Sequence, residues 1–281
     1  MHIVALGSSF AAGPSIPPQS SAAARHSSNN YASLLSRSIP NSKLTDLSAS
    51  GATLLNVLSE PQETLLATLP PQLDGLPSDA DIVTLTAGGN DLGYSAGMIG
   101  DAAKLTVDDK ELLGMMLEGM GLKKDSADAA NANANHNGGA VPGVSKEEVA
   151  TRFIAVIDAI KARAPKARVF LVEYLAVFGP GTVLADDQPL GEERLAFYRG
   201  LAGELKGAYR LAAEAREDSG VEVVSVADLS ERGHALGSEE AWVTGFTVEG
   251  LMGGGAPFHP NAEGHRGVAE VLREKVMKVV G

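Results

Sequence analysis

The chain has 281 residues, of which 44% are hydrophobic and 21% are charged, so it contains enough apolar side chains to bury a full core. This composition excludes a disordered chain, and we expect a single domain. The formal charge is −12, with 23 basic against 35 acidic residues. Nucleic-acid binding needs clustered Lys and Arg, and no such cluster is present, so the sequence predicts a small or neutral ligand and no nucleic-acid partner.

Cysteine is absent, which leaves carboxylate, imidazole and hydroxyl groups as the available chemistry. The first residues, 1–7, lack the basic leader and cleavage site of a secretory signal. No apolar run approaches the roughly 20 residues that span a membrane. We therefore expect no transmembrane segment and a cytoplasmic protein, unless a leader precedes this sequence. The oligomeric state is not indicated.

Short apolar or β-branched runs recur along the chain and predict strands. Their continuous hydrophobicity is typical of strands buried on both faces, as in a parallel sheet. The five runs are residues 3–6, 43–47, 81–86, 168–174 and 221–226.

Helical patterns lie between these runs. The clearest is 146–164, where apolar residues form one stripe after Ser145, a predicted N-cap with Glu148 three residues later. Residues 192–218 and 261–279 have the same character. Alternating strands and helices predict a doubly wound α/β fold with a mostly parallel sheet, whose functional loops follow the carboxyl ends of the strands.

Residues 95–143 interrupt this alternation with a segment far longer than the usual connection of about 2 to 6 residues. We interpret it as a lid-like insertion. Residues 108–122 predict a Met-rich amphipathic helix, and residues 125–139 form an Ala/Asn/Gly-rich loop. The Met side chains could wall an acyl pocket or could be buried in the core, and the sequence leaves both readings open.

Four small or polar turns fall at the predicted carboxyl edge of the sheet. A Gly-Ser turn alone is ordinary loop chemistry, but a serine at a strand end can also be an exposed nucleophile beside backbone N–H groups. The four turns are residues 7–13, 48–52, 86–91 and 259–265.

Taken together, these turns resemble the four blocks of the SGNH (GDSL-type) hydrolase superfamily. The first block, Gly-Asp-Ser in the family, reads Gly-Ser-Ser here and carries the nucleophile onto Ser9. The second block matches Gly51, the Gly-x-Asn-Asp block matches Asn90, and the His-Pro-Asn block carries the base onto His259. The resemblance covers residues 3 to about 278. It implies a flavodoxin-like three-layer α/β/α sandwich with a mostly parallel five-stranded sheet.

The resemblance also implies a cofactor-independent serine ester hydrolase that forms a covalent acyl-enzyme on a small or lipid-like ester. Ser9 would attack, His259 would act as the base, and the Ser9 and Gly51 N–H groups with the Asn90 amide would form the oxyanion hole. An acyltransferase, a carbohydrate O-deacetylase and a non-catalytic ligand-binding domain are the alternatives on the same fold.

Two departures from the family pattern bear on the site. Ser8 replaces the Asp beside the nucleophile, and Ala256 stands three residues before His259, where many relatives have Asp. The imidazole needs a partner that fixes its tautomer, and a carbonyl can serve. We expect the Ala256 carbonyl to orient His259; a distant carboxylate, Glu249 or Asp228, is the competing hypothesis.

Other polar and aromatic residues are assigned smaller roles. The remaining histidines show no metal-ligand spacing, and no phosphate-binding, dinucleotide or calcium motif is present, so we expect no metal and no cofactor. We expect Asp91 to hold the Asn90 loop. Trp242 and Phe246 could line a substrate pocket or pack in the core. The other histidines are His2, His26, His136, His234 and His265.

Overall fold

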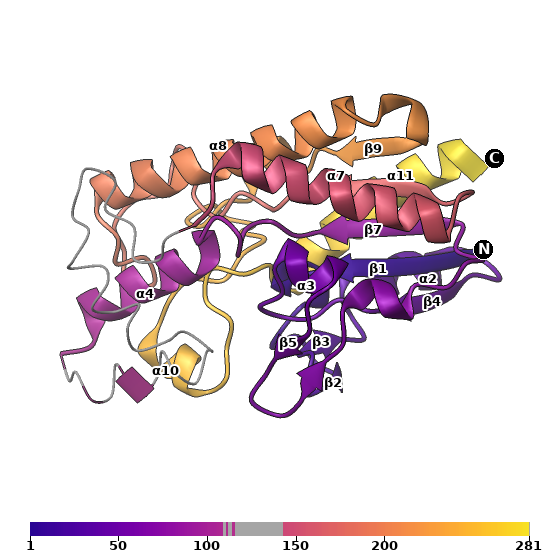
Figure 1. Ribbon diagram of the computed structural model, residues 1–281. Helices are drawn as coiled ribbons and strands as arrows, with labels where there is room; N and C mark the ends of the chain where they lie inside the picture. Colours follow the sequence, from indigo (N-terminus) through magenta and orange to yellow (C-terminus); the bar gives the residue numbers. More distant parts are fainter. Residues whose placement is uncertain (109–110, 112–113, 116–142, 281) are drawn as a thin grey trace.

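A parallel five-stranded sheet forms the centre of the protein (Figure 1), as seen in a computed structural model that describes residues 1–108, 111, 114–115 and 143–280. The strand order is β4-β1-β7-β8-β9, which confirms the predicted flavodoxin-like sandwich. Each strand coincides with one of the five predicted runs, within a few residues at its ends. The strands are β1 His2–Gly7, β4 Lys43–Asp46, β7 Ile82–Thr86, β8 Arg168–Val172 and β9 Val221–Val224.

The centre of the sheet is fully buried. In β1 every residue is buried, and Val4 pairs with Thr45 of β4 on one side and Val83 of β7 on the other. The chain order reverses at β1, so the connections from β1 and from β7 leave on opposite sides of the sheet. Such a switch point opens a crevice at the carboxyl ends of the two strands.

Helices cover both faces of the sheet (Figure 1). On one face, α7 (Lys146–Arg163) packs against α8 (Glu192–Glu214) and α3 (Leu54–Leu58), whereas α2 (Tyr31–Ser38) packs against α11 (Ala262–Val280) on the other. The predicted apolar stripe of α7 is buried, and its predicted cap is confirmed because the Ser145 hydroxyl accepts from the Glu148 N–H at 3.2 Å.

Shorter elements occupy the loops. Within the described residues, no helix is long and apolar enough to cross a membrane. The short elements are α1 Ser9–Ala12, β2 Gln19–Ser21, β3 His26–Ser27, β5 Gln62–Glu63, β6 Thr68–Leu69, η1 Gln72–Gly75, η2 Glu217–Ser219, α9 Ala227–Gly233 and α10 Val248–Met252.

The predicted insertion begins with helix α4 (Tyr94–Thr106), which packs on α8; the Tyr198 hydroxyl donates to the Asp101 carboxylate at 2.7 Å. The predicted helix 108–122, apart from a few of its residues, and the whole loop 125–139 lie outside the described residues. The chain returns at Val144, whose N–H donates to the Asp91 carbonyl at 2.9 Å. At Val144 the chain therefore contacts the loop that precedes α4.

Candidate active site

The turn after β1 is fixed by backbone contacts. Gly7 has φ +135°, and a Cβ there would lie 2.2 Å from the Thr86 carbonyl oxygen, so no side chain fits. The Ser8 N–H donates to that same carbonyl at 2.8 Å. The Gln72 amide binds both backbone groups of Gly7, at 2.8 and 2.9 Å. The position of Ser9, the first residue of α1, follows from these constraints.

Ser9 and His259, 250 residues apart, meet at the carboxyl edge of the sheet. The Ser9 Oγ lies 2.8 Å from His259 Nε2, and His259 Nδ1 lies 2.8 Å from the Pro257 carbonyl oxygen. A carbonyl can only accept, so the Nδ1 proton is donated to Pro257 and Nε2 is left to accept from the serine. This tautomer suits a general base acting on a serine hydroxyl.

The expectation that the Ala256 carbonyl orients His259 is wrong by one residue. The Ala256 carbonyl accepts from the Thr244 hydroxyl at 2.7 Å, and Pro257 provides the acceptor for the imidazole. Phe258, between Pro257 and His259, has φ +58°, a left-handed conformation that folds the backbone so that the carbonyl and the ring face each other. Its ring is fully buried, and this packing holds the unusual backbone in place.

The competing carboxylates do not contact the imidazole. Glu249 is exposed on α10, and Asp228 pairs with Lys206. In the described parts of the chain, the partner of His259 Nδ1 is the Pro257 carbonyl and no carboxylate. The geometry is that of a Ser-His pair oriented by a backbone dipole.

Burial sets the charge of His259. The residue is 7% exposed, and burial lowers its pKa to about 4; the hydrogen bond to Pro257 opposes this shift, and the positive charge of Arg25 adds to it. The imidazole is therefore neutral at pH 7. Only the neutral form can accept a proton from a serine.

Gly51 and Asn90 lie on adjacent turns. Gly51 has φ +86°, which favours glycine, and the Gln62 amide donates to the neighbouring Ser50 carbonyl at 2.7 Å. The Asn90 Nδ2 donates to the Ala52 carbonyl at 2.9 Å. Since an amide nitrogen carries two protons, this bond fixes the Asn90 side chain and leaves one N–H for another acceptor.

Asp91 ties the Asn90 loop to two helices, as expected. Its buried carboxylate accepts from the Leu54 N–H at the start of α3 at 3.0 Å and from Arg152 of α7 at 2.9 Å. Burial raises the pKa of Asp91, and these two donors oppose the shift.

Tyr174 is a site residue that sequence reasoning missed. Its hydroxyl lies 2.5 Å from the Ser8 Oγ, and its ring stacks on Phe10, the residue after Ser9, with centroids 4.0 Å apart. A Cβ on Gly89, next to Asn90, would lie 2.5 Å from the Tyr174 ring. The place of Tyr174 just after the fourth strand was the available signal, because that position lies at the same edge as the four turns.

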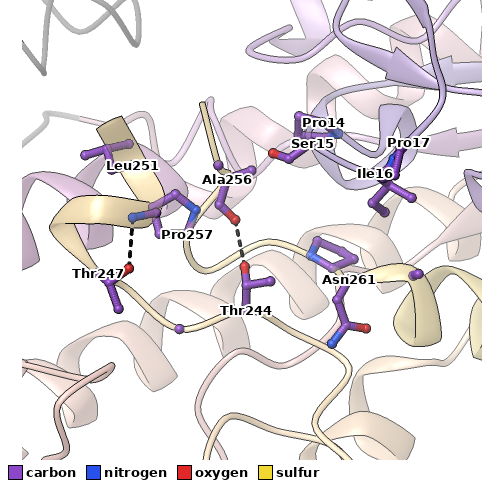
Figure 2. A pocket seen from close by; sticks show the side chains of 15 residues that line it. Pro14, Ser15, Ile16, Pro17, Thr244, Thr247, Leu251, Ala256, Pro257 and Asn261 are labelled. Carbon is purple, nitrogen blue, oxygen red and sulfur yellow. Dashed lines mark hydrogen bonds between the residues drawn. The ribbon is translucent and has the colours of Figure 1, made fainter. Parts of the chain in front are cut away.

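An apolar pocket of about 430 Å³ opens beside the histidine loop (Figure 2). One wall is formed by residues 14–17, which follow α1, and the facing wall by Leu251, Ala256 and Pro257. Thr244 and Asn261 lie at its base in this view. The segments that carry Ser9 and His259 thus continue directly into the pocket walls.

The aromatic residues Trp242 and Phe246 do not line this pocket. Trp242 stacks on His234 with centroids 3.9 Å apart, and Phe246 is buried 6.0 Å from the Phe258 ring, so packing is what they contribute. His265 is also buried, and its Nδ1 accepts from the Tyr31 N–H at 3.0 Å.

Two other histidines, His2 and His26, form ring hydrogen bonds with residues other than Ser9 and His259. His2 contacts Asp79 and Thr45, and His26 lies 2.9 Å from the Ser20 hydroxyl. His136 is outside the described residues.

Comparison with known proteins identifies relatives that cover nearly the whole chain. Lipase 2 of Streptomyces coelicolor is 27% identical over 278 residues, which is 96% of this chain and 84% of that protein. The crystal structures of an extracellular lipase from Streptomyces rimosus and of phospholipase A1 from Streptomyces albidoflavus each superpose with a TM-score of 0.65 at 23% identity. Each covers 98% of this chain, and the chain covers 99% and 98% of them, so the whole fold is shared.

The family assignment rests on a match that spans most of the chain. Residues 5–266 match the GDSL-like Lipase/Acylhydrolase family, a range that includes all four turns recognised in the sequence. With a serine and a neutral histidine in contact at the edge where this family's blocks meet, the chain belongs to the GDSL-like lipase/acylhydrolases and is a carboxylic ester hydrolase.

Proposed function

We propose that Ser9 is the nucleophile and His259 the general base of a Ser-His dyad that hydrolyses esters with an apolar portion. The observation that carries this proposal is the continuous contact from the Ser9 hydroxyl through the imidazole to the Pro257 carbonyl, with both polar contacts of the ring at 2.8 Å.

In the acylation step, His259 Nε2 takes the Ser9 proton as Oγ attacks the ester carbonyl carbon. The imidazolium that forms is stabilised by the Pro257 carbonyl dipole at Nδ1. Collapse of the tetrahedral intermediate breaks the bond to the alcohol, which receives the proton from Nε2. Water then attacks the acyl-serine in the same way, and the acid is released.

The oxyanion would be held by backbone N–H groups of Ser9 and Gly51 and by the free N–H of Asn90. The Asn90 amide is oriented by Ala52 before substrate binds, so no reorganisation is needed as negative charge develops. Such preorganised donors typically contribute about 3 kcal/mol each to lowering the barrier.

The pocket beside the histidine loop supports an ester with an apolar group. Its lining is mostly apolar, with Pro, Ile, Leu and Ala residues beside a few polar ones such as Thr244 and Asn261, and its volume of about 430 Å³ suits a short or medium chain. This size favours a small or lipid-like ester over a polymeric substrate.

Covalent labelling and mutagenesis test the assignment. A fluorophosphonate should label Ser9, as located by peptide mass mapping, and Ser9→Ala should abolish both labelling and hydrolysis of p-nitrophenyl butyrate. His259→Ala should lower kcat by about 10⁴ or more, and the double variant should lose little beyond either single variant, because nucleophile and base act as one unit. An active Ser9→Ala protein, or strictly additive losses, would contradict the dyad.

A further inference from the structure

Arg25 lies on a segment separate from the two that carry Ser9 and His259. The preceding residue, Ala24, accepts a hydrogen bond from the Ser50 N–H at 2.8 Å, beside Gly51. The Arg25 side chain extends to the histidine loop, where Nη2 donates to the Gly254 carbonyl at 3.2 Å. Residues 24 and 25 therefore connect the turn of Gly51, a proposed oxyanion donor, to the loop that carries His259.

The guanidinium also lies beside the apolar pocket. The Ser15 hydroxyl, in the pocket wall, donates to the same Gly254 carbonyl at 3.3 Å, and Gly255 lines the pocket. In Figure 2 Ser15 faces the loop that contains Ala256. A ligand with its apolar part in the pocket would therefore carry its polar end close to Arg25.

The charge of Arg25 has no counter-ion within the described part of the chain. Some arginines pair with carboxylates, as Arg152 does with Asp91, whereas Arg25, like Arg163 and Arg199, contacts a backbone carbonyl instead. The side chain is half-buried, and burial lowers its pKa. A partly desolvated cation without an anion is unfavourable in a free protein, and an anionic ligand would remove that cost.

The remaining guanidinium donors have the right chemistry for such a ligand. One Nη2 proton is used by Gly254, while the donors left over can bind an oxyanion in the planar, forked arrangement that phosphates and carboxylates accept. The positive charge of Arg25 also lowers the pKa of His259.

We infer that Arg25 binds an anionic group of the substrate, such as a phosphate on the alcohol portion, so that the preferred substrate is an anionic amphiphilic ester. This inference rests on the proposed ester hydrolysis at Ser9. It adds a specificity residue that neither contacts the scissile bond nor belongs to the four sequence blocks.

The test compares two esters that differ only in the anion: 1-decanoylglycerol and 1-decanoylglycerol 3-phosphate, both below their critical micelle concentrations. Selectivity is the ratio of kcat/KM for the phosphate ester to kcat/KM for the neutral ester. Arg25→Gln should lower this ratio about tenfold or more, mainly through KM, because a charge-assisted hydrogen bond is lost. Arg25→Lys should keep part of the ratio. Arg163→Gln is the matched control, since Arg163 also donates to a carbonyl, that of Asp74, and should keep the whole ratio.

An unchanged ratio in Arg25→Gln, or equal losses on both esters, would overturn the inference and leave Arg25 as a link between loops. If Arg25→Gln does not fold, inhibition of the native enzyme decides: glycerol 3-phosphate should compete with p-nitrophenyl butyrate where glycerol does not, and equal behaviour of the two would overturn the inference. Failure of the proposed function is separate, because it would appear as neutral-ester hydrolysis that survives Ser9→Ala.

Discussion

The two segments that carry Ser9 and His259, the proposed catalytic residues, are held in different ways. The turn of Ser9 continues a central strand and is fixed by the Gln72 amide and the Thr86 carbonyl. The loop of His259 lies outside the sheet and is organised largely by Thr244, whose N–H donates to the His259 carbonyl and whose carbonyl accepts from the Phe258 N–H, both at 2.9 Å. Ser9 is therefore placed by the central sheet, and His259 is placed largely by contacts between its loop and Thr244.

This difference predicts where changes are tolerated. A substitution beside the strand-end turns disturbs a largely buried network of hydrogen bonds, so activity and stability should fall together. A substitution in the histidine loop affects few other contacts, so activity should change with little effect on the core. Measurements on variants of both regions test this contrast between the strand-end turns and the histidine loop.

The largest effect is expected at Asn90, on a strand-end turn. Asn90→Ala should lower kcat by about 10² to 10³ with a smaller change in KM, because the free N–H of its amide would contact charge that develops only in the transition state. Steady-state kinetics with p-nitrophenyl butyrate measures this. A pure KM effect would instead assign Asn90 to substrate positioning.

The pH profile should show the buried state of His259. Activity requires the neutral imidazole, so kcat/KM should rise with pH through the pKa of His259, which burial lowers to about 4. The enzyme should keep most of its activity at pH 5, where an imidazole of ordinary pKa would be mostly protonated and activity about 30-fold lower. An acid limb near pH 6.5, in a protein shown by circular dichroism to stay folded, would contradict this.

Tyr174→Phe should lower kcat about tenfold, because the Ser8 hydroxyl beside the nucleophile loses its partner at 2.5 Å. The loss should be accompanied by destabilisation of about 1 kcal/mol, measured by urea unfolding. Tyr198→Phe is the matched control: it removes a buried hydroxyl bonded to Asp101, away from the turn, and should affect stability without lowering kcat. Equal kcat values for the two variants would remove Tyr174 from the positioning of Ser9.

Thr244→Val should lower kcat a few-fold and leave the unfolding transition nearly unchanged. The variant keeps the backbone bonds of Thr244 but loses the hydroxyl contact to the Ala256 carbonyl at 2.7 Å, so the histidine loop becomes less well ordered. Kinetics and thermal unfolding of the same preparation test both parts. A large drop in the melting temperature would show that this loop is as tightly coupled to the core as the nucleophile turn.

The smallest effect is expected for Glu249 and Asp228, the carboxylates of the competing hypothesis. Glu249→Ala and Asp228→Ala should each change kcat less than about twofold, since a triad carboxylate would instead contribute up to about 10⁴. If either variant lost more than a hundredfold in kcat with the fold intact, that carboxylate, and not the Pro257 carbonyl, would be the group that orients His259.

The strands of the sheet and the turns at their carboxyl ends were predicted from the sequence. Apolar runs located all five strands, and the turns after them were expected at one edge because parallel strands bring their carboxyl ends together. The resemblance to the family then singled out Ser9, Gly51 and Asn90 within those turns. The choice of Ala256 over Pro257 failed because it depends on the direction of one peptide plane, set by the positive φ of Phe258 and by a long-range contact to Thr244. The position of Tyr174 after the fourth strand placed it at the right edge, but its contact with Ser8 joins residues 166 positions apart, and no local pattern pairs the two.

The hydrogen bond from Val144 to the Asp91 carbonyl has a consequence for protein engineering. The start of this span belongs to the core, because α4 packs on α8 and buries Met98, Ile99 and Ala102. A segment exchanged here therefore has to begin after α4 and end before Val144. Loop-closure entropy grows only slowly with segment length, so segments of different lengths joined between Val107 and Val144 should leave the strand register unchanged.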